Sequence, residues 1–362
     1  MEYNVIGLMS GSSLDGLDIA FVHFEESAGK WQYEIKETSC IIYPEEWRKK
    51  LSSLNGMKAE DYFLLHTAYG HWLGHRVNEF LEQKNLSYRV QLIASHGHTA
   101  FHLPAQKMTA QLGDGAAISA VTGIRTISDL RNVDVALGGQ GAPIVPIGEK
   151  LLLQEYNLFL NIGGIANLSV NGENFIGFDV CPANRVLNSL AKNTDKGFDE
   201  NGVLASAGKI DPLLLQKLND FDYYSKPYPK SLSNEFGINE IIPLMEKSGL
   251  SKVDALATYV RHIVIQVSRA LSLLKQKLPG RGKLNLLITG GGAHNKFLVE
   301  SLRKEVLPDN IECIVPGDEL ADYKEALIIA FIGVLRWRED INVMQSVTGA
   351  SKDSINGAIW SV

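Results

Sequence analysis

The sequence predicts a mixed α/β fold made of two similar domains, and three observations support this prediction. The segment Gly7–Ala20 reads as an apolar strand, a turn of small residues and a second apolar strand. The same pattern returns at Tyr156–Val170, where a Gly-Gly turn joins the two strands. The length of 362 residues also exceeds what one compact core usually accommodates. A duplicated fold is therefore expected.

Apolar periodicity predicts the elements of the first half in order. Strands are expected at 3–9, 17–25 and 31–43, a helix at 59–83, and further strands at 90–95 and 126–130. In the helix, apolar and aromatic residues return every three or four positions, which is typical of a helix with one buried side. Strands interleaved with helices in this way indicate a mixed α/β unit.

The second half repeats this order. A hairpin at 156–170 is followed by a strand at 174–179, a helix at 252–278, strands at 284–289 and 311–315, and a helix at 320–337. The GGQGAP turn at 138–143 separates the halves, so we expect a boundary near residue 135. The predicted domains are 1–135 and 136–344, with a tail of about 345–362 that packs back on the first domain.

Composition excludes several classes of protein. A net charge of −6 and a pI near 5.9 leave no basic face for nucleic acid. No apolar run approaches the roughly 20 residues that span a bilayer, and no basic segment precedes the short apolar start, so a cytoplasmic location is expected. Cys40, Cys181 and Cys313 are far apart and fit reduced thiols better than disulfides or a zinc site.

The two hairpin turns are candidates for binding phosphate. Gly11, Gly16, Gly163 and Gly164 lack a β-carbon, so the backbone there can adopt positive φ and approach a ligand closely. Successive N–H groups in such turns bind anions. Asp15 and Asp18 beside the first turn can hold magnesium, directly or through a bound water. For either turn alone, an ordinary hairpin is an equal alternative.

A third glycine run, Gly290 to Gly292, follows the strand at 284–289 and precedes a helix expected near His294. Backbone N–H groups and the positive end of a helix dipole at one spot are typical of a nucleotide pocket. A plain strand-to-helix turn remains the alternative. Neither a P-loop nor a G-x-G-x-x-G motif between a strand and a helix is present in the sequence.

Polar residues in apolar surroundings mark further candidates. Asp179 ends a strand just before Pro182, so it is expected either as a general base or as a helix cap. The segment SHGHTAFHLP, from Ser95, carries three histidines without the further ligands of a zinc site, which favours hydrogen bonding to a polar ligand or to the backbone. The segment from Ser128 to Pro143 adds Asp129, Arg131 and Asp134.

Seven segments together resemble a known family. GLMSGSSLDGLDIA, ASHGHTAFHLP, SDLRNVDVALGGQGAPIVP, LNIGGIANLSV, IGFDVCPAN, ITGGGAHN and SVTGASKDSINGAIW are similar, in this order, to the motifs of the anhydro-N-acetylmuramic acid kinase family. The resemblance implies an actin-like ATPase (ribonuclease H-like) fold with a central cleft between two domains. It implies hydrolysis of the internal anhydro bond of 1,6-anhydro-N-acetylmuramic acid and phosphorylation of O6 by ATP with Mg²⁺, in peptidoglycan recycling, by a homodimer.

Matching residue by residue, the resemblance implies roles for individual side chains. Asp179 matches the catalytic base, and Arg131 and Glu325 match positions that contact the sugar, to which we add His98 and Asp129. The residues expected to bind ATP are Gly11, Ser12, Ser13, Asp15, Gly16, Asp18, Asn161, Gly163, Gly164, Gly290, Gly291 and Gly292.

One departure from the family pattern bears on the substrate. Val180, Cys181 and Ala183 replace the usual threonine and two glycines beside the base. This puts the choice of sugar in doubt more than the class of reaction. A kinase of another 1,6-anhydro sugar such as levoglucosan, and a non-catalytic nucleotide-dependent sugar sensor, therefore remain alternatives. Arg131 favours the muramic acid derivative because its guanidinium can pair with the lactyl carboxylate.

Overall fold

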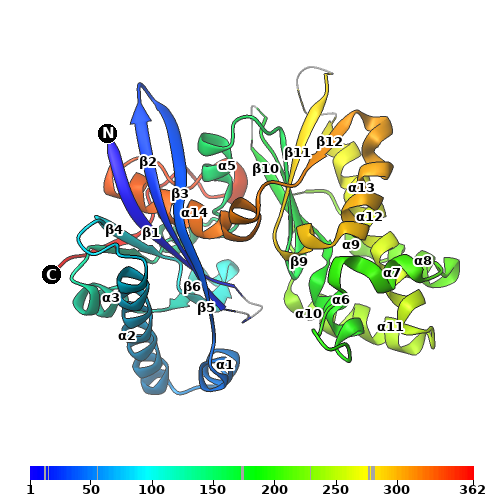
Figure 1. The fold of residues 1–362 in the computed structure, drawn as a ribbon, viewed down its shortest axis with the longest axis horizontal. Coiled ribbons are helices and arrows are strands. Elements are labelled where there is room, and N and C mark those ends of the chain that lie inside the picture. The colour runs from blue at the N-terminus through cyan, green and yellow to red at the C-terminus, as the bar shows by residue number, and fades with distance from the viewer. Residues whose placement is uncertain are drawn as a thin grey trace. The chain divides into compact units, whose positions relative to one another are not determined.

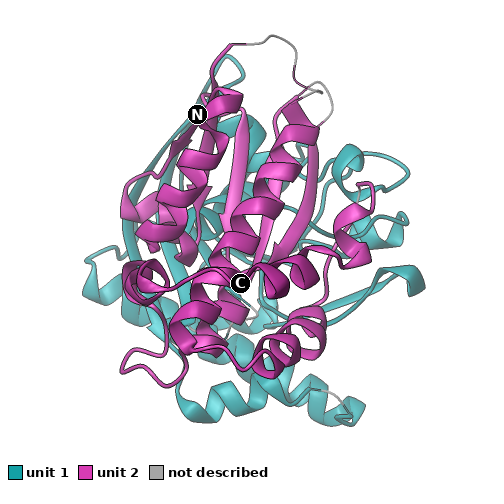
Figure 2. Cartoon of the chain, turned by 90° about the vertical axis from the view of Figure 1, so that its right-hand side faces the viewer, with its two compact units in different colours: residues 1–153, 323–362 teal, residues 154–322 magenta. Residues whose placement is uncertain are grey.

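The computed structural model describes residues 1–362 except 12, 13, 15, 55, 173, 174, 229, 276, 277 and 279–281. The chain forms two compact units, unit 1 from residues 1–153 and 323–362, and unit 2 from residues 154–322 (Figures 1 and 2). The first boundary thus lies 18 residues beyond the expected position, because hydrogen bonds hold the GGQGAP turn inside unit 1: Gln140 N–H donates to the Thr348 carbonyl at 2.8 Å. The tail from residue 345 also belongs to unit 1.

Unit 1 contains a six-stranded sheet. Its order is β13-β7-β4-β1-β2-β3, in which β1 to β3 form an antiparallel meander, β4 and β7 run parallel to β1, and β13 pairs antiparallel with β7. A separate hairpin is formed by β5 and β6. The strands are β1 Glu2–Ser10, β2 Gly16–Ser27, β3 Lys30–Ile42, β4 Leu92–Ser95, β5 His98–Leu103, β6 Met108–Leu112, β7 Thr126–Ser128 and β13 Ala358–Trp360.

Helices pack on both faces of this sheet, because side chains alternate along β1. Ile6 and Leu8 belong to the core cluster that includes Tyr69 of α2. On the other face, Gly7 lies against α14: a β-carbon at Gly7 would be 2.0 Å from the Ala326 carbonyl oxygen. The helices of unit 1 are α1 Glu45–Ser52, α2 Ala59–Gln83, α3 Gly115–Thr122, α4 Asn132–Ala136, α5 Pro146–Leu152, α14 Asp318–Trp337, which begins in the last residues of unit 2, and α15 Gln345–Thr348.

Unit 2 repeats the strand order of unit 1. Its sheet runs β10-β9-β8-β11-β12, again an antiparallel meander of three strands followed by two parallel ones. The predicted duplication and mixed α/β class are therefore confirmed, and this strand order is the ribonuclease H-like arrangement. The strands are β8 Leu158–Ile162, β9 Ile165–Val170, β10 Ile176–Pro182, β11 Leu284–Thr289 and β12 Ile311–Ile314.

The long helix α12, with the shorter α13 beside it, packs along the sheet of unit 2 (Figure 1). Tyr259, Ile263 and Val267 of α12 are almost fully buried in the core cluster that includes strands β8 and β11. The helices are α6 Asn184–Ala191, α7 Val203–Ala207, α8 Pro212–Asn219, α9 Asp222–Ser225, α10 Asn234–Phe236, α11 Ile242–Lys247, α12 Lys252–Lys275 and α13 Lys296–Val306.

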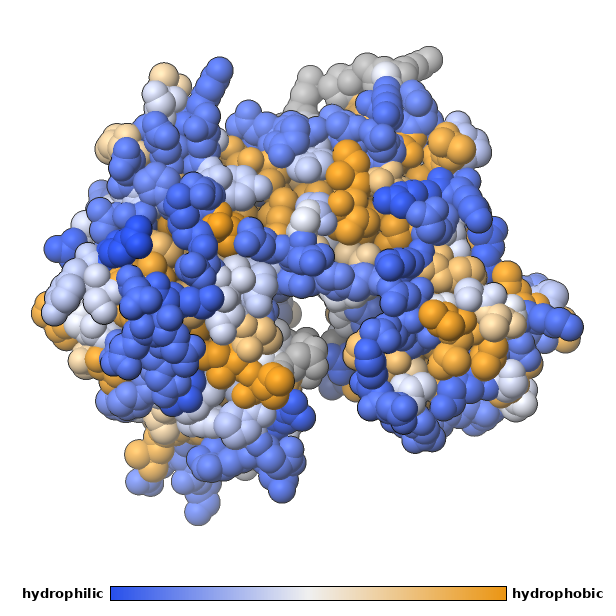
Figure 3. Space-filling view, viewed as in Figure 1, coloured by the Kyte–Doolittle hydropathy of each residue, from blue (hydrophilic) through white to orange (hydrophobic). Residues whose placement is uncertain are grey.

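Hydrophilic residues cover most of the face that Figure 3 shows, with hydrophobic residues in separate patches between them. Among the helices of the described residues, none combines the length and the apolar character that a membrane span requires.

Candidate active site

In unit 1, the predicted Asp129 and two further polar residues, Ser10 and His96, lie at the carboxyl ends of parallel strands. Leu8 of β1 pairs with Ser95 of β4, and Ala94 pairs with Ile127 of β7. Because parallel strands end at one edge of a sheet, the residues that follow them are gathered there, which is the usual ligand edge of an α/β sheet. Ser10, His96 and Asp129 come to this edge.

Arg131 is the centre of this group. Its Nε and Nη2 donate to His96 Nε2 at 2.9 and 2.7 Å, and its Nη1 donates to the Gly141 carbonyl at 2.8 Å. A guanidinium has five N–H donors, so one N–H on each terminal nitrogen has no partner among the described residues. His96 can accept both bonds because burial lowers its pKa to about 3 and keeps the ring neutral.

The charges of two carboxylates, Glu325 and Asp134, act on Arg131. Burial lowers the pKa of Arg131 to about 10, and the negative charges of Glu325 and Asp134 partly offset this effect, so the guanidinium stays charged near neutral pH. Asp134 is fully buried and accepts from Gly141 N–H at 2.7 Å and from the Thr348 hydroxyl at 2.6 Å. Asp134 therefore fixes the turn and the tail rather than facing a ligand.

Asp129 is held in a conformation that few residues other than glycine adopt. Its φ is 59°, and such a conformation persists only where surrounding contacts enforce it. Here the indole N–H of Trp360 donates to Ser128 Oγ at 2.9 Å, and this hydroxyl donates to Asp129 Oδ2 at 2.7 Å. The tail of the chain thus orients Asp129.

The structure describes only part of the first turn that was predicted to bind phosphate. Ser12, Ser13 and Asp15 lie outside the described residues. Asp18 lies on β2 near Tyr43, whose pKa is raised to about 12, first by burial and further by the charge of Asp18. The described residues contain no cluster of three potential metal ligands. Asp18 still fits Mg²⁺, which proteins usually hold with one or two carboxylates together with phosphate oxygens and water.

In unit 2, the structure brings Asn161 and the triple glycine together at the ends of the parallel strands β8 and β11, where Thr289 pairs with Asn161. Gly290 has φ of 80°, and a β-carbon there would be 2.5 Å from Asn161 Oδ1. At Gly292, a β-carbon would be 2.2 Å from Ile162 Cγ2, so the glycine packs directly on this side chain. Gly291, by contrast, is exposed, and a β-carbon on it would meet only Asn184 Nδ2 at 3.6 Å.

The Gly163–Gly164 turn was expected to allow positive φ or close approach of a ligand. None of Gly16, Gly163 and Gly164 has positive φ. A β-carbon on Gly163 would come no closer than 3.6 Å to another part of the protein. The Gly163 and Gly164 carbonyls accept from the Asn184 and Ala183 N–H groups at 3.0 and 2.8 Å, so the turn is anchored to the start of α6.

Asp179 lies at a β-bulge, where the pairing of β10 with β9 shifts between Asp179 and Cys181. It does not cap α6, because the residue before this helix is Ala183, whose side chain forms no capping hydrogen bond. Instead its Oδ2 accepts from Leu232 N–H at 2.8 Å, and its carbonyl accepts from the Tyr223 hydroxyl at 2.6 Å. Bulges often redirect side chains near active sites.

Burial sets the proton affinity of Asp179. Burial raises its pKa above the ordinary value, while the hydrogen bond from Leu232 N–H lowers it in part. A carboxylate with a raised pKa has the properties of a general base when, as here, the described residues use only part of its hydrogen-bonding capacity.

Arg185 was not among the predicted residues. Its guanidinium lies beside Gly164, where a β-carbon would meet Arg185 Nε and Nη2 at 3.7 Å. It lies in the first turn of α6, where the helix dipole disfavours a cation.

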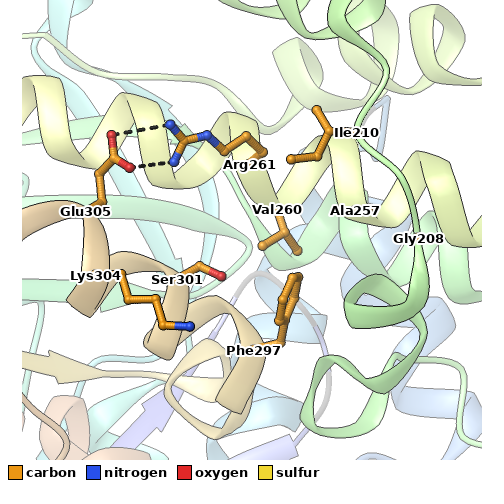
Figure 4. A pocket seen from close by; sticks show the side chains of 9 residues that line it. All are labelled: Gly208, Ile210, Ala257, Val260, Arg261, Phe297, Ser301, Lys304 and Glu305. Atoms are coloured by element: carbon orange, nitrogen blue, oxygen red, sulfur yellow. Dashed lines mark hydrogen bonds and ion pairs between the residues drawn. The ribbon is translucent and has the colours of Figure 1, made fainter.

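A pocket in unit 2 lies apart from these residues. It is lined by parts of α12, α13 and the loop before α8, with an ion pair between Arg261 and Glu305 at 2.5 Å (Figure 4). None of the predicted site residues lines this pocket.

A substitution at Gly163 should separate folding from nucleotide binding. Gly163→Val is expected to weaken ATP binding at least about tenfold if phosphates approach this turn, because the side chain would take up space that the protein leaves open. Calorimetric titration with an ATP analogue measures the affinity. Gly282→Val is the matched control, since nothing lies within 4 Å of a β-carbon there. Equal affinities for the two variants would make the turn a plain hairpin.

Three comparisons with known proteins bear on this site. Residues 3–362 match the family model described as anhydro-N-acetylmuramic acid kinase. Proteins of that name from Haemophilus influenzae and Sulfurovum sp. are 33% and 32% identical, with alignments covering 98% of this chain and 97% and 98% of theirs. A solved structure of the activator of 2-hydroxyisocaproyl-CoA dehydratase from Clostridium difficile, with bound ADPNP, aligns over 94% of this chain and 96% of its own at 16% identity, with a TM-score of 0.46.

Proposed function

This chain belongs to the anhydro-N-acetylmuramic acid kinase family, and from that premise we propose that it hydrolyses and phosphorylates 1,6-anhydro-N-acetylmuramic acid. In the proposed reaction, water opens the 1,6-anhydro bond and O6 receives the γ-phosphoryl group of ATP. The products are N-acetylmuramic acid 6-phosphate and ADP. The reaction serves peptidoglycan recycling and amino sugar degradation.

The environment of Asp179 is the observation that supports this proposal most strongly. Its carboxylate is partly buried, has a raised pKa and lies on a bulge. The bulge is close to the Gly163–Gly164 turn, because Ile165, directly after the turn, pairs with Pro182. A base is thus held at the same end of the hairpin as a turn expected to bind phosphate.

The roles of the residues follow from the chemistry. Asp179 accepts a proton from the water that attacks the anomeric carbon, which breaks the bond from that carbon to O6. The departing O6 attacks the γ-phosphorus, so the general acid of a glycosidase is not needed. Mg²⁺, held through Asp18, would neutralise charge on the phosphates, and the rest of the catalysis is positioning.

Arg131 favours the muramic acid derivative over other anhydro sugars. We propose that the N–H groups of its terminal nitrogens that have no described partner bind the lactyl carboxylate, a group that levoglucosan lacks. His98, Asp129 and Glu325 would bind the remaining polar groups of the sugar. A non-catalytic sensor would not need a carboxylate with a raised pKa, so Asp179 counts against that alternative.

The glycines at 290–292, together with Asn161, are proposed to bind the nucleotide. Gly291 supports this proposal because it is exposed and the protein leaves space at its α-carbon. A reaction that consumes ATP fits a cytoplasmic location. The homodimer stays a prediction.

The fate of the anhydro bond tests the proposed function. In water enriched in oxygen-18, the label is expected at the anomeric hydroxyl and not in the phosphate, because water attacks carbon while O6 stays on the sugar. Mass spectrometry of the product and of its dephosphorylated sugar locates the label. Attack opposite O6 should also give the inverted anomer first, which rapid NMR can detect before mutarotation.

Two results would contradict the proposal. Label in the phosphate would mean that water attacks phosphorus. A product phosphorylated at another hydroxyl, with its anhydro ring intact, would make the protein a conventional sugar kinase.

A further inference from the structure

Three hydroxyl groups and one histidine form a continuous hydrogen-bonded chain in the core of unit 1. The Tyr69 and Tyr43 hydroxyls are 2.6 Å apart, the Tyr43 hydroxyl donates to Ser10 Oγ at 2.7 Å, and Ser10 Oγ lies 3.0 Å from His98 Nδ1. All four residues are buried, with at most 6% of their surface exposed. The chain runs from α2 to the end of β1 and the start of β5, at the edge of the sheet that carries the candidate site.

The direction of this chain follows from counting protons. The Tyr43 hydroxyl has one proton and gives it to Ser10, so the bond between the two tyrosines is donated by Tyr69. Ser10 Oγ keeps its own proton, and His98 Nδ1 is its one remaining hydrogen-bond partner among the described residues, so we assign this proton to the bond with His98 Nδ1. Burial lowers the pKa of His98 to about 4, so the ring is neutral near pH 7. A neutral ring that accepts at Nδ1 carries its hydrogen on Nε2.

The neighbouring His96 has the opposite arrangement. Its Nε2 accepts from Arg131, and its Nδ1–H donates to the Gly97 carbonyl at 2.9 Å. His96 is therefore the Nδ1–H tautomer because of Arg131 and Gly97, whereas His98 is the Nε2–H tautomer because of Ser10. The one N–H group of the His96 ring is used by the Gly97 carbonyl, so His96 has no N–H left for a ligand. The Nε2–H of His98, by contrast, has no acceptor among the described residues.

We propose that Tyr69, Tyr43 and Ser10 are positioning residues that fix His98 as an Nε2–H donor to an uncharged oxygen of the sugar. The inference rests on the proposed function for the identity of the ligand. An uncharged oxygen, a hydroxyl or the N-acetyl carbonyl, suits a neutral imidazole, while the charged Arg131 suits a carboxylate. The same arrangement excludes His98 as a general base, because Nδ1 is engaged and Nε2 already carries a proton.

The tautomer can be measured without any substrate. In the full-length protein with ¹⁵N-labelled histidine, long-range proton–nitrogen spectra at pH 7 distinguish Nε2–H from Nδ1–H rings, and His98→Gln identifies the signal of His98. Wild-type His98 is expected as Nε2–H. Ser10→Ala removes the partner of Nδ1 and should give a mixture of tautomers, whereas Ser10→Thr keeps the hydroxyl and should preserve the wild-type signal.

Kinetics test the donation to the sugar. A glutamine amide reaches the position of Nε2 and an asparagine amide that of Nδ1, so the two substitutions of His98 form a matched pair. His98→Asn should raise the KM for the anhydro sugar at least about tenfold with little change in the KM for ATP, and His98→Gln should retain most of the wild-type affinity. Ser10→Ala should raise the same KM several-fold, with recovery in Ser10→Thr.

The spectra test the tautomer of His98, and the kinetics test its hydrogen bond to the sugar. A wild-type His98 that is Nδ1–H or charged at pH 7 would overturn the hydroxyl chain as the source of the tautomer. Equal sugar KM values for His98→Asn and His98→Gln would overturn the donation from Nε2. Wild-type turnover with the anhydro sugar reports on the proposed function alone, so a missing activity would not be mistaken for a wrong tautomer.

Discussion

Asp179→Asn is expected to lower turnover at least about 100-fold while leaving the binding of ATP and sugar nearly unchanged. Asparagine has the same shape and can still accept the hydrogen bond from Leu232 N–H, so the bulge should persist. It cannot take a proton from water, so only the chemical step is lost. Steady-state kinetics measure turnover, and calorimetry with each ligand measures binding.

The dependence of activity on pH also tests whether Asp179 is the base. The base must be ionised, so kcat/KM should fall as pH falls through the pKa of Asp179, which burial raises above the ordinary value. The acid limb should therefore lie above the pH at which an exposed aspartate titrates, and it should be absent from any residual activity of the variant. The exposed Asp195→Asn is the matched control. Near-normal turnover in Asp179→Asn would mean that another group is the base.

Arg131→Gln is expected to raise the KM for anhydro-N-acetylmuramic acid about 100-fold, the usual scale for removing one partner of a buried charged contact. Glutamine can still reach His96 with its amide, but it provides neither the charge nor the planar fork that binds a carboxylate. The KM for levoglucosan, which has no lactyl group, should change much less. Kinetics with both sugars measure this difference.

Arg89→Gln provides the control for this variant, since Arg89 is exposed. Thermal unfolding should be recorded beside the kinetics, because Arg131 also holds the Gly141 carbonyl. A similar loss of affinity for both sugars would assign Arg131 to a part of the sugar other than the lactyl group. An unchanged KM for anhydro-N-acetylmuramic acid would remove Arg131 from the binding site.

Long periodic elements could be predicted closely from the sequence. The helix expected at 59–83 is α2, with the same bounds, and the strand expected at 284–289 is β11. In α2 the periodic apolar residues form the buried face, and in β11 the mostly apolar run forms an almost fully buried strand. By contrast, β13 has only three residues, and such a segment becomes a strand only through pairing with β7, to which no local pattern points.

The candidate site was predictable in its residue types rather than in its contacts. Asp179 and Arg131 were singled out because they lie in or beside apolar segments, and their expected roles came from the resemblance to the family. The hydroxyl chain behind His98 was missed because Ser10, Tyr43 and Tyr69 are ordinary core residues in sequence and come together only in the fold. Gly163 does not have positive φ, because glycine at a turn permits that conformation without requiring it, and the other expectation for Gly163, close approach of a ligand, stays a prediction.

The dependence of Asp129 on Trp360 has a consequence for protein synthesis. The Trp360 indole supports Asp129 through Ser128, and β13 completes the edge of the sheet in unit 1. Residues 128 and 360 are separated by most of the chain, so this part of the site cannot form on the ribosome until translation has passed Trp360. All of unit 2, residues 154–322, is therefore synthesised before Trp360 can support Asp129.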